Sequence, residues 1–381
     1  MKNLQLRLFY VSQGLAFSYF WLAIAIPYLL YRGLSTQEVF SLMAIYQYMG
    51  VFLEYPTGVI GDRFGYRKVL FVANTFNFLS MLVMAMSGGY YLYLFALLLL
   101  AIGSGFSSGN DMGLLKSVSS SVKKDTANYN SLMDFVLFVS SILGGFISQI
   151  SYEFALITSG FCMFAANIPL NFLKSHNEQV MITTPLHEVV KQGFGSLKNV
   201  QLRQLFIFVA LFGGFSFTIK NIFGSFGTIY GIDVSQIGII IGLGGLTRSM
   251  GSKIYAEYQK LNAFVVSLFV IFSLLFMSVF PSYVVVVGLM MFNQLLFGYI
   301  LSKIDGDLQD LASDTVRASL FSLKRLVMRL VSASYLIVYG IAVGADKFAL
   351  CMFATGLVLL IGVLYVKKYV VAQSAATGAL Q

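Results

Sequence analysis

The chain has 381 residues, of which 58% are hydrophobic and only 11% charged, and its formal net charge is +9. A soluble domain carries about 25% charged residues, so this composition excludes an ordinary soluble protein. The apolar runs reach about 20 residues, as membrane helices do, whereas the strands of a membrane barrel are about 10 residues long. The basic residues lie in short loops between these runs, so the positive charge does not indicate nucleic-acid binding.

The apolar runs predict an all-α membrane protein with twelve transmembrane helices in two groups of six. In chain order we expect spans at Leu6–Leu30, Val39–Ile60, Val69–Met86, Tyr91–Leu115, Tyr129–Ile150 and Phe154–Phe172, and then at Leu205–Tyr230, Ile237–Tyr255, Ala263–Phe280, Val284–Ile304, Leu320–Val343 and Phe348–Val366.

The longest polar segment follows the sixth span and divides the chain. We therefore expect an N-terminal bundle of residues 1–174, a cytoplasmic linker of residues 175–204 and a C-terminal bundle of residues 205–368. Apolar residues recur at helical spacing from Leu186 to Leu197, which predicts an amphipathic helix on the membrane surface. Residues 369–381 are expected to be a disordered tail.

The distribution of Lys and Arg predicts the orientation. If the N-terminus lies in the cytoplasm and the spans alternate, only Arg32 and Lys347 fall on the outer side, and Lys220 lies within a span. All the other lysines and arginines then lie at inner ends and loops, as the positive-inside rule requires. We expect a multi-pass protein of the cell membrane with both termini in the cytoplasm.

One stretch between the second and third spans combines glycines with four charges. Tyr55–Leu70 reads YPTGVIGDRFGYRKVL, and its glycines permit tight turns and close backbone contact. Its charged residues hold the turn in water. The proposed gating loop consists of Gly58, Gly61, Asp62, Arg63, Gly65, Arg67 and Lys68.

This stretch resembles the signature G-x-x-x-D-R-x-G-R-K of the major facilitator superfamily, which lies between the second and third spans. The preceding Glu54–Gly58 is similar to the E-x-P-T-G of a bacterial branch, which Ser108–Leu115 and Arg317–Ser322 also resemble. The resemblance implies two pseudo-symmetric six-helix bundles around a central cavity, and transport by alternating access. Ser140–Gly145 keeps the glycine pair of the antiporter signature without its proline, which weakens the argument for exchange with protons.

Charged residues inside the spans are candidates for function, because a charge at the bilayer centre is costly. In the superfamily the second span faces the eleventh, and the fifth faces the eighth. On that frame Glu54 pairs with Arg329 and Asp134 with Arg248 across the two bundles. The alternative for each pair is a side chain that reaches the headgroups or bonds within its own bundle. Asp111 is expected to act in gating or helix packing.

Carboxylates in a poorly solvated cavity are also candidates for proton coupling, and Glu54 and Asp134 are the deepest. Polar and aromatic residues within the spans are candidates for the substrate cavity, although helix packing explains most of them equally well. These residues are Lys220, Trp21, Gln47, Asn77, Asn293 and Gln294.

The function that these patterns favour is secondary transport, with proton-coupled efflux of a small amphiphilic or drug-like compound. Uptake of a small organic anion is the alternative within this class, for which Lys220 and Arg329 would be the argument. A non-transporting sensor or scaffold is the alternative outside it. The chain contains no ATP-binding signature and no motif of a membrane-embedded enzyme. We expect no cofactor and no metal, an ion gradient (H⁺) as the energy source, a small-molecule substrate and a monomer in the bilayer.

Overall fold

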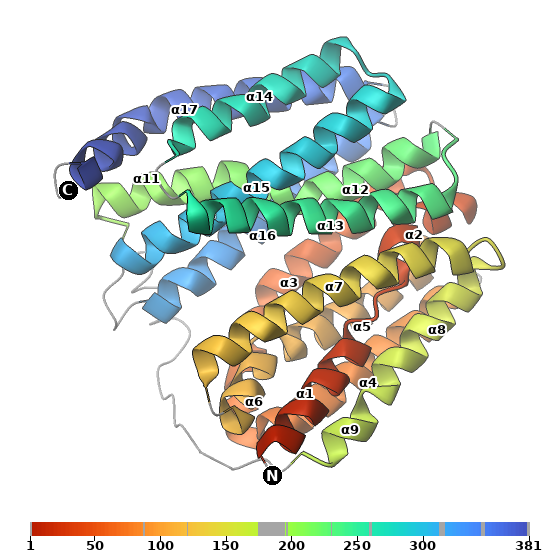
Figure 1. Cartoon of the computed structure of the whole chain (residues 1–381). Coiled ribbons are helices and arrows are strands. Elements are labelled where there is room, and N and C mark those ends of the chain that lie inside the picture. The colour runs from red at the N-terminus through yellow and green to blue at the C-terminus, as the bar shows by residue number, and fades with distance from the viewer. Residues whose placement is uncertain are drawn as a thin grey trace. The chain divides into compact units, whose positions relative to one another are not determined.

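The computed structural model describes residues 2–86, 88–119, 121–173, 195, 197–229, 231–258, 261–311, 317–343 and 347–378. Within these ranges some side chains lie outside the description, among them those of residues 54–59, 62–63, 122–124 and 220. The described residues form helices and connecting turns, with no strand among them (Figure 1). Contacts divide the chain into unit 1, Met1–Thr183 with Gly224–Gly242, and unit 2, Thr184–Phe223 with Leu243–Gln381.

Unit 1 contains the first nine helices. These are α1 (Lys2–Ala16), α2 (Trp21–Tyr31), α3 (Thr36–Phe64), α4 (Tyr66–Ala85), α5 (Tyr90–Ser107), α6 (Asn110–Val118), α7 (Val122–Ile147), α8 (Tyr152–Ala165) and α9 (Asn167–Asn171). Side-chain caps begin two of them. Ser35 and Glu38 form a capping box on α3, and the Ser151 hydroxyl accepts the N–H of Phe154 in the first turn of α8. Helix α4 packs against both α5 and α8.

Unit 2 contains the helices of the second half. These are α11 (Val200–Phe208), the π-helical turn η1 (Val209–Gly213), α14 (Ala263–Val279), α15 (Tyr283–Leu311), α16 (Arg317–Val343) and α17 (Phe348–Gly378). Two further helices, α12 (Gly214–Ile229) and α13 (Val234–Glu257), each have residues in both units. Helices α14 and α17 lie side by side (Figure 1).

Nine helical stretches of the described chain are long and apolar enough to cross a membrane. Helix α14 is apolar but shorter, at 17 residues. Helices α3 and α13 are 29 and 24 residues long, and at about 1.5 Å per residue either is long enough for a hydrocarbon core of about 30 Å. The prediction of an all-helical membrane protein is therefore confirmed, while the count of twelve spans stays a prediction.

The first span is not one helix, although the sequence predicts a continuous one. Helix α1 ends at Ala16 and α2 begins at Trp21. The Ser18 hydroxyl donates to the Gly14 carbonyl at 3.0 Å, a bond that competes with the helical pattern and bends helices. The Ser18 carbonyl in turn accepts the Ser159 hydroxyl of α8 at 2.9 Å, so a neighbouring helix stabilises the interruption.

The fourth and sixth spans are also interrupted. Gly109 takes φ +81° between α5 and α6, a conformation that glycine adopts without strain. Helix α8 ends at Ala165, and α9 follows with Pro169 inside it. Proline has no N–H to donate to the fourth preceding carbonyl, which explains the break.

The structure describes most of the C-terminal tail but little of the linker. Helix α17 continues to Gly378, beyond the expected end of order at Lys368, and the alanines near its end favour helix. The expected amphipathic helix of the linker lies mostly outside the described residues.

Candidate transport site

The stretch between the second and third spans is helical for most of its length, not a loop. Helix α3 continues to Phe64 and α4 begins at Tyr66, so the turn is the single residue Gly65, with φ +90°. The prediction of a multi-residue loop is therefore wrong, while the exit of this stretch from the bilayer stays a prediction. Four charges in a short stretch are compatible with a helix whose end lies in water.

Two glycines allow this stretch and the end of the fourth span to approach closely. A Cβ on Gly61 would collide with the Asn110 side chain, and one on Gly113 would lie 2.6 Å from the Tyr66 ring. Arg67 donates to the Leu173 carbonyl at 2.8 Å, at the end of the sixth span. Lys68 is exposed. The side chains of Asp62 and Arg63 lie outside the description, and Gly58 is described only as a residue of helix α3.

The predicted charge pairs are described in part. Asp134 lies on α7, Arg248 on α13 and Arg329 on α16, and each has at least one interaction partner. The side chain of Glu54 lies outside the described residues, as does that of Lys220. The pairing across the bundles therefore stays a prediction.

The predicted cavity residues are mostly buried. Trp21, Gln47, Asn77 and Asn293 are at most 9% exposed. The Asn293 amide oxygen accepts the Ser273 hydroxyl at 2.7 Å, which joins α14 to α15, and Asn77 fills the space beside Gly103 of α5. The structure thus places both asparagines between packed helices. Gln294 is half-buried and lies near Gly244.

Asp111 lies where the fourth span is interrupted. It is in the first turn of α6, where a negative charge is stabilised by the helix dipole. Its Oδ1 accepts the Met112 N–H and its Oδ2 accepts the Tyr129 hydroxyl, both at 2.7 Å. Tyr19 lies in the break of the first span.

The ring of Tyr129, whose hydroxyl bonds this carboxylate, packs against other aromatic rings. The rings of Phe17 and Tyr19 stack at 5.2 Å with an interplanar angle of 23°, and Phe17 meets the Tyr129 ring edge-on at 6.5 Å. Tyr129 is 3% exposed, whereas Asp111 and Tyr19 are half-buried. We call Phe17, Tyr19, Asp111 and Tyr129 the acidic aromatic cluster.

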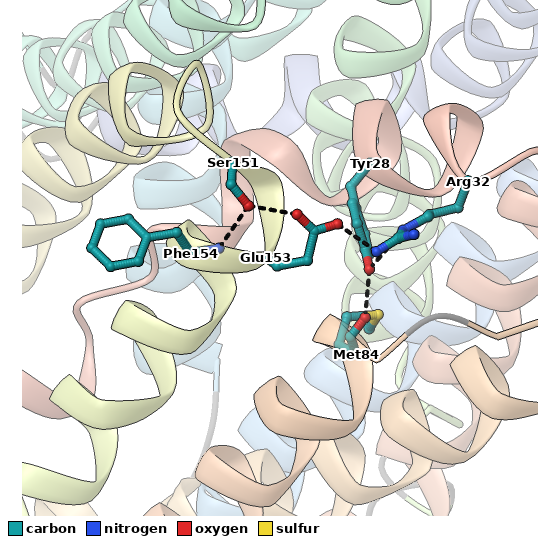
Figure 2. A network of polar contacts seen from close by, with 6 residues as sticks. All are labelled: Tyr28, Arg32, Met84, Ser151, Glu153 and Phe154. Carbon is teal, nitrogen blue, oxygen red and sulfur yellow. Dashed lines mark hydrogen bonds and ion pairs between the residues drawn. The ribbon is translucent and has the colours of Figure 1, made fainter.

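A second polar network of unit 1 joins the end of α2 to the beginning of α8 (Figure 2). Arg32, just beyond α2, forms an ion pair with Glu153 at the start of α8. The Arg32 guanidinium also donates to the Tyr28 hydroxyl at 3.2 Å, which raises the pKa of Arg32, and the Tyr28 hydroxyl donates to the Met84 carbonyl. Ser151 donates to the free oxygen of the Glu153 carboxylate. The network joins the first, third and sixth spans.

A close backbone contact joins α7 to the beginning of α13 within unit 1. A Cβ on Gly238 would lie 2.5 Å from the Ser141 carbonyl oxygen, and one on Gly145 would lie 2.9 Å from the Val234 carbonyl oxygen. Gln149 donates to the Ser235 hydroxyl at 3.0 Å. The glycine pair that resembled an antiporter signature therefore lies in a helix–helix contact. We call this contact the glycine seam.

Sequence reasoning missed the acids at the end of α15. Lys303 forms an ion pair with Asp307 at 3.2 Å, and Lys324 of α16 forms one with Asp305. The first pair has the i, i+4 spacing of a helical ion pair, so the sequence contained a signal for it. The second joins two helices, and no local pattern could have shown it. Within the described part of the chain, no group of His, Cys, Asp and Glu is arranged to hold a metal.

These features define a polytopic helical membrane protein with polar groups at interrupted spans. The chain belongs to the Major Facilitator Superfamily, whose family model matches residues 8–335. The family and the structural relatives are those of a transporter, not an enzyme. No curated protein matches the chain in sequence.

Solved structures similar to this chain are transporters of different solutes. The nucleoside transporter NupG has a TM-score of 0.76 at 12% identity, covering 97% of this chain and 98% of that one. A POT family transporter in complex with 5-aminolevulinic acid has a TM-score of 0.75 at 14% identity, covering 96% of both chains. A D-xylose–proton symporter has a TM-score of 0.74 at 13% identity, covering 97% and 98%. At this identity the likeness shows the fold.

Proposed function

We propose that the protein is a secondary transporter that exports a small amphiphilic compound in exchange for protons, by alternating access. Membership of the superfamily over residues 8–335 carries the transporter part of this proposal. The abundance of aromatic and aliphatic residues, with few charges in the spans, supports an amphiphilic cargo. The chain has no ATP-binding signature, so a gradient must supply the energy.

The proposed architecture has twelve spans in two pseudo-symmetric bundles, with both termini in the cytoplasm of a monomer. Nine spans meet the criteria of length and composition, and α3, α13 and α14 supply helices for the other three. The distribution of Lys and Arg supports the orientation.

Proton coupling is proposed to use acids within the spans, namely Glu54, Asp134 and Asp111. A carboxylate that moves between a wet and a dry environment changes its proton affinity, which is the basis for coupling. One structural relative is a D-xylose–proton symporter, which supports a proton gradient in this fold. We expect transport to lose its dependence on pH when Glu54 and Asp134 are both replaced by Gln. Uptake that still depends on pH in this variant would count against these two acids.

Gating is proposed to use the stretch from Gly58 to Lys68 and the charge pairs Glu54–Arg329 and Asp134–Arg248. In this proposal Asp62 interacts with the N-terminal end of the eleventh span when the inner side is closed, because the helix dipole there favours a negative charge. Gly61 packs against Asn110, which supports a role in close contact between helices.

The proposal is tested by reconstitution of the full chain in proteoliposomes with an imposed pH gradient. The expected result is that a lipophilic dye-like solute moves against its own gradient when protons move down theirs, and that a protonophore abolishes the movement. Matched liposomes without protein measure leakage. If solute equilibrates but never accumulates, the protein is a facilitator, and the absence of any flux would favour a sensor or scaffold.

A further inference from the structure

A groove follows the neighbouring helices α1 and α7 of unit 1 (Figure 1). Its volume is about 470 Å³, within the range of about 300–1,000 Å³ that is typical of ligand pockets. Most of the lining is apolar and includes Val11 and Leu15 on α1 and Leu132, Val136 and Leu143 on α7. Val11 and Leu143 are 55% and 43% exposed, so the groove is open along its edge and not enclosed.

The chemistry of the lining favours hydrocarbon. The residues that line the groove include no acid and no base. The Tyr10 hydroxyl donates to the Asp125 carbonyl at 3.2 Å, and the Ser18 hydroxyl donates to a carbonyl of its own helix at 3.0 Å. The third hydroxyl residue, Ser140, is buried. A charged group that entered the groove would lose its hydration without gaining an ionic partner there.

Gly14 deepens the groove near its middle. A Cβ on Gly14 would lie 3.9 Å from Cγ2 of Val136, an ordinary contact distance, whereas one on Gly144 of α7 would lie 2.1 Å from a carbonyl oxygen. Glycines in membrane helices usually allow two backbones to approach closely, as Gly144 does. Gly14 weakens α1 without such an approach. The side chain that Gly14 lacks instead leaves space beside Val136 for an occupant.

The groove is about as long as one leaflet of a bilayer is thick. Leu143 follows Leu132 by 11 residues on α7, a distance of about 16 Å along the helix. Half of a hydrocarbon core of about 30 Å is about 15 Å. An extended chain advances about 1.2 Å per bond, as a peptide backbone does at about 3.5 Å per three bonds, so about 13 bonds fit in this length. On α1 the groove begins at Tyr10 and ends in the break of the first span, at Ser18 and Phe20.

A positive charge lies beyond the end of the groove that is nearer to the N-terminus. Arg7 is exposed and precedes Val11 by four residues, so both lie on one face of α1. The acid at this end, Asp125, is 6% exposed, and its Oδ2 accepts the Ser119 hydroxyl at 2.6 Å. The exposed charge is therefore that of Arg7. Basic residues at the end of a membrane helix attract anionic lipid headgroups.

We propose that the groove between α1 and α7 binds one acyl chain of an anionic membrane phospholipid, whose phosphate lies at Arg7. Both helices are parts of candidate membrane spans, so the apolar edge of the groove meets hydrocarbon in a bilayer. The chain fills the space beside Gly14 and ends at the break of the first span. This lipid site goes beyond the proposed transport function and does not depend on it.

The test is native mass spectrometry of the purified full-length protein in one short-chain detergent. The protein is titrated with phosphatidylglycerol and with phosphatidylcholine that has the same acyl chains. We expect the first phosphatidylglycerol to bind about tenfold tighter than the next, and about fivefold tighter than phosphatidylcholine because of the charge of Arg7. Successive lipids that bind equally, with no preference for either headgroup, would mean an ordinary lipid shell and would overturn the proposal.

Variants separate the acyl chain from the headgroup. Gly14→Leu fills the groove and should weaken binding of the first lipid about tenfold, whereas Gly14→Ala adds only a Cβ at contact distance and should keep most of it. The matched control is Gly288→Leu on α15, where a Cβ meets nothing within 4 Å, and it should bind lipid like wild type. Equal lipid binding by folded Gly14→Leu and Gly288→Leu proteins would overturn the site. Arg7→Gln should remove the preference for phosphatidylglycerol, and Arg7→Lys should restore it.

The wild-type protein decides the question if Gly14→Leu does not fold. Phosphatidylglycerol with a photoreactive group at the end of one acyl chain should cross-link near Phe20 or Leu143, at the far end of the groove. Cross-links confined to other helices would refute the site. Competition with dodecanoate separates a membrane lipid from a free single-chain amphiphile. Displacement of phosphatidylglycerol by dodecanoate at equal concentration would overturn the lipid assignment and make the groove a site for such an amphiphile.

Discussion

The close approach of two backbones in the glycine seam predicts how much a substitution there destabilises the protein. A Cβ on Gly238 would lie 2.5 Å from the Ser141 carbonyl oxygen, whereas ordinary contact begins at 3.4 Å, so Gly238→Ala must separate two backbones by roughly 0.9 Å. Neither atom belongs to a flexible side chain that can move aside. Such overpacking costs about 1–3 kcal/mol, and alanine returns about 0.5–1 kcal/mol of helix propensity.

The matched control lies two turns further along the same helix. A Cβ on Gly245 meets nothing within 4 Å, so Gly245→Ala gains helix propensity without a clash. The two variants should therefore differ in unfolding free energy by about 1–3 kcal/mol, with Gly238→Ala the less stable.

The assay is equilibrium unfolding in mixed micelles, followed by the fluorescence of Trp21. This is the only tryptophan of the chain, and it lies in unit 1, where the seam also lies. Gly238→Ala should also transport more slowly in proteoliposomes than Gly245→Ala. Equal stability of the two variants would refute the claim that main-chain contact at Gly238 is tight.

Three further predictions concern charges. If Glu54 and Arg329 pair, the double charge reversal should recover part of the transport lost by either single reversal, and additive losses would exclude the pair. The side chains of the Arg32–Glu153 ion pair are 23% and 32% exposed. A double-mutant cycle should therefore give a coupling of about 0.5–1 kcal/mol in the free energy of unfolding. A coupling near zero would show that solvent screens the pair. The Asp62→Asn variant should insert and fold normally, as judged by size-exclusion chromatography, while its solute flux falls. Normal flux would mean that the stretch from Gly58 to Lys68 only connects two helices.

The sequence predicted the helical spans because their signal is local. A run of about 20 apolar residues has few alternatives to a membrane helix, so the end of α4 at Ala85 and the beginning of α15 at Tyr283 could be placed to within a few residues. The interruptions carry a weaker signal. Ser18 bonds to Gly14 in its own helix, but the partner of its carbonyl, Ser159, is 141 residues away.

The candidate site was predictable as a set of residues and not as an arrangement. Asp111 and Trp21 stand out as polar or unusual residues in apolar runs, whereas Tyr129 is one of 22 tyrosines and shows nothing special until it meets Asp111. Asn293 and Asn77 illustrate the opposite case, because buried amides look alike in sequence whether they line a cavity or join two helices. Only the contact with Ser273 assigns Asn293 to packing.

The interruption of the first span also bears on how the protein fits bilayers of different thickness. Helix α1 has 15 residues and α2 has 11, which correspond to about 22 Å and 16 Å at 1.5 Å per residue, together longer than a hydrocarbon core of about 30 Å. A straight helix adapts to a thinner membrane through a single tilt of its whole length. A jointed span has two tilts, so α1 and α2 can each adjust to the lipid separately while both keep their contacts with α7 and α8.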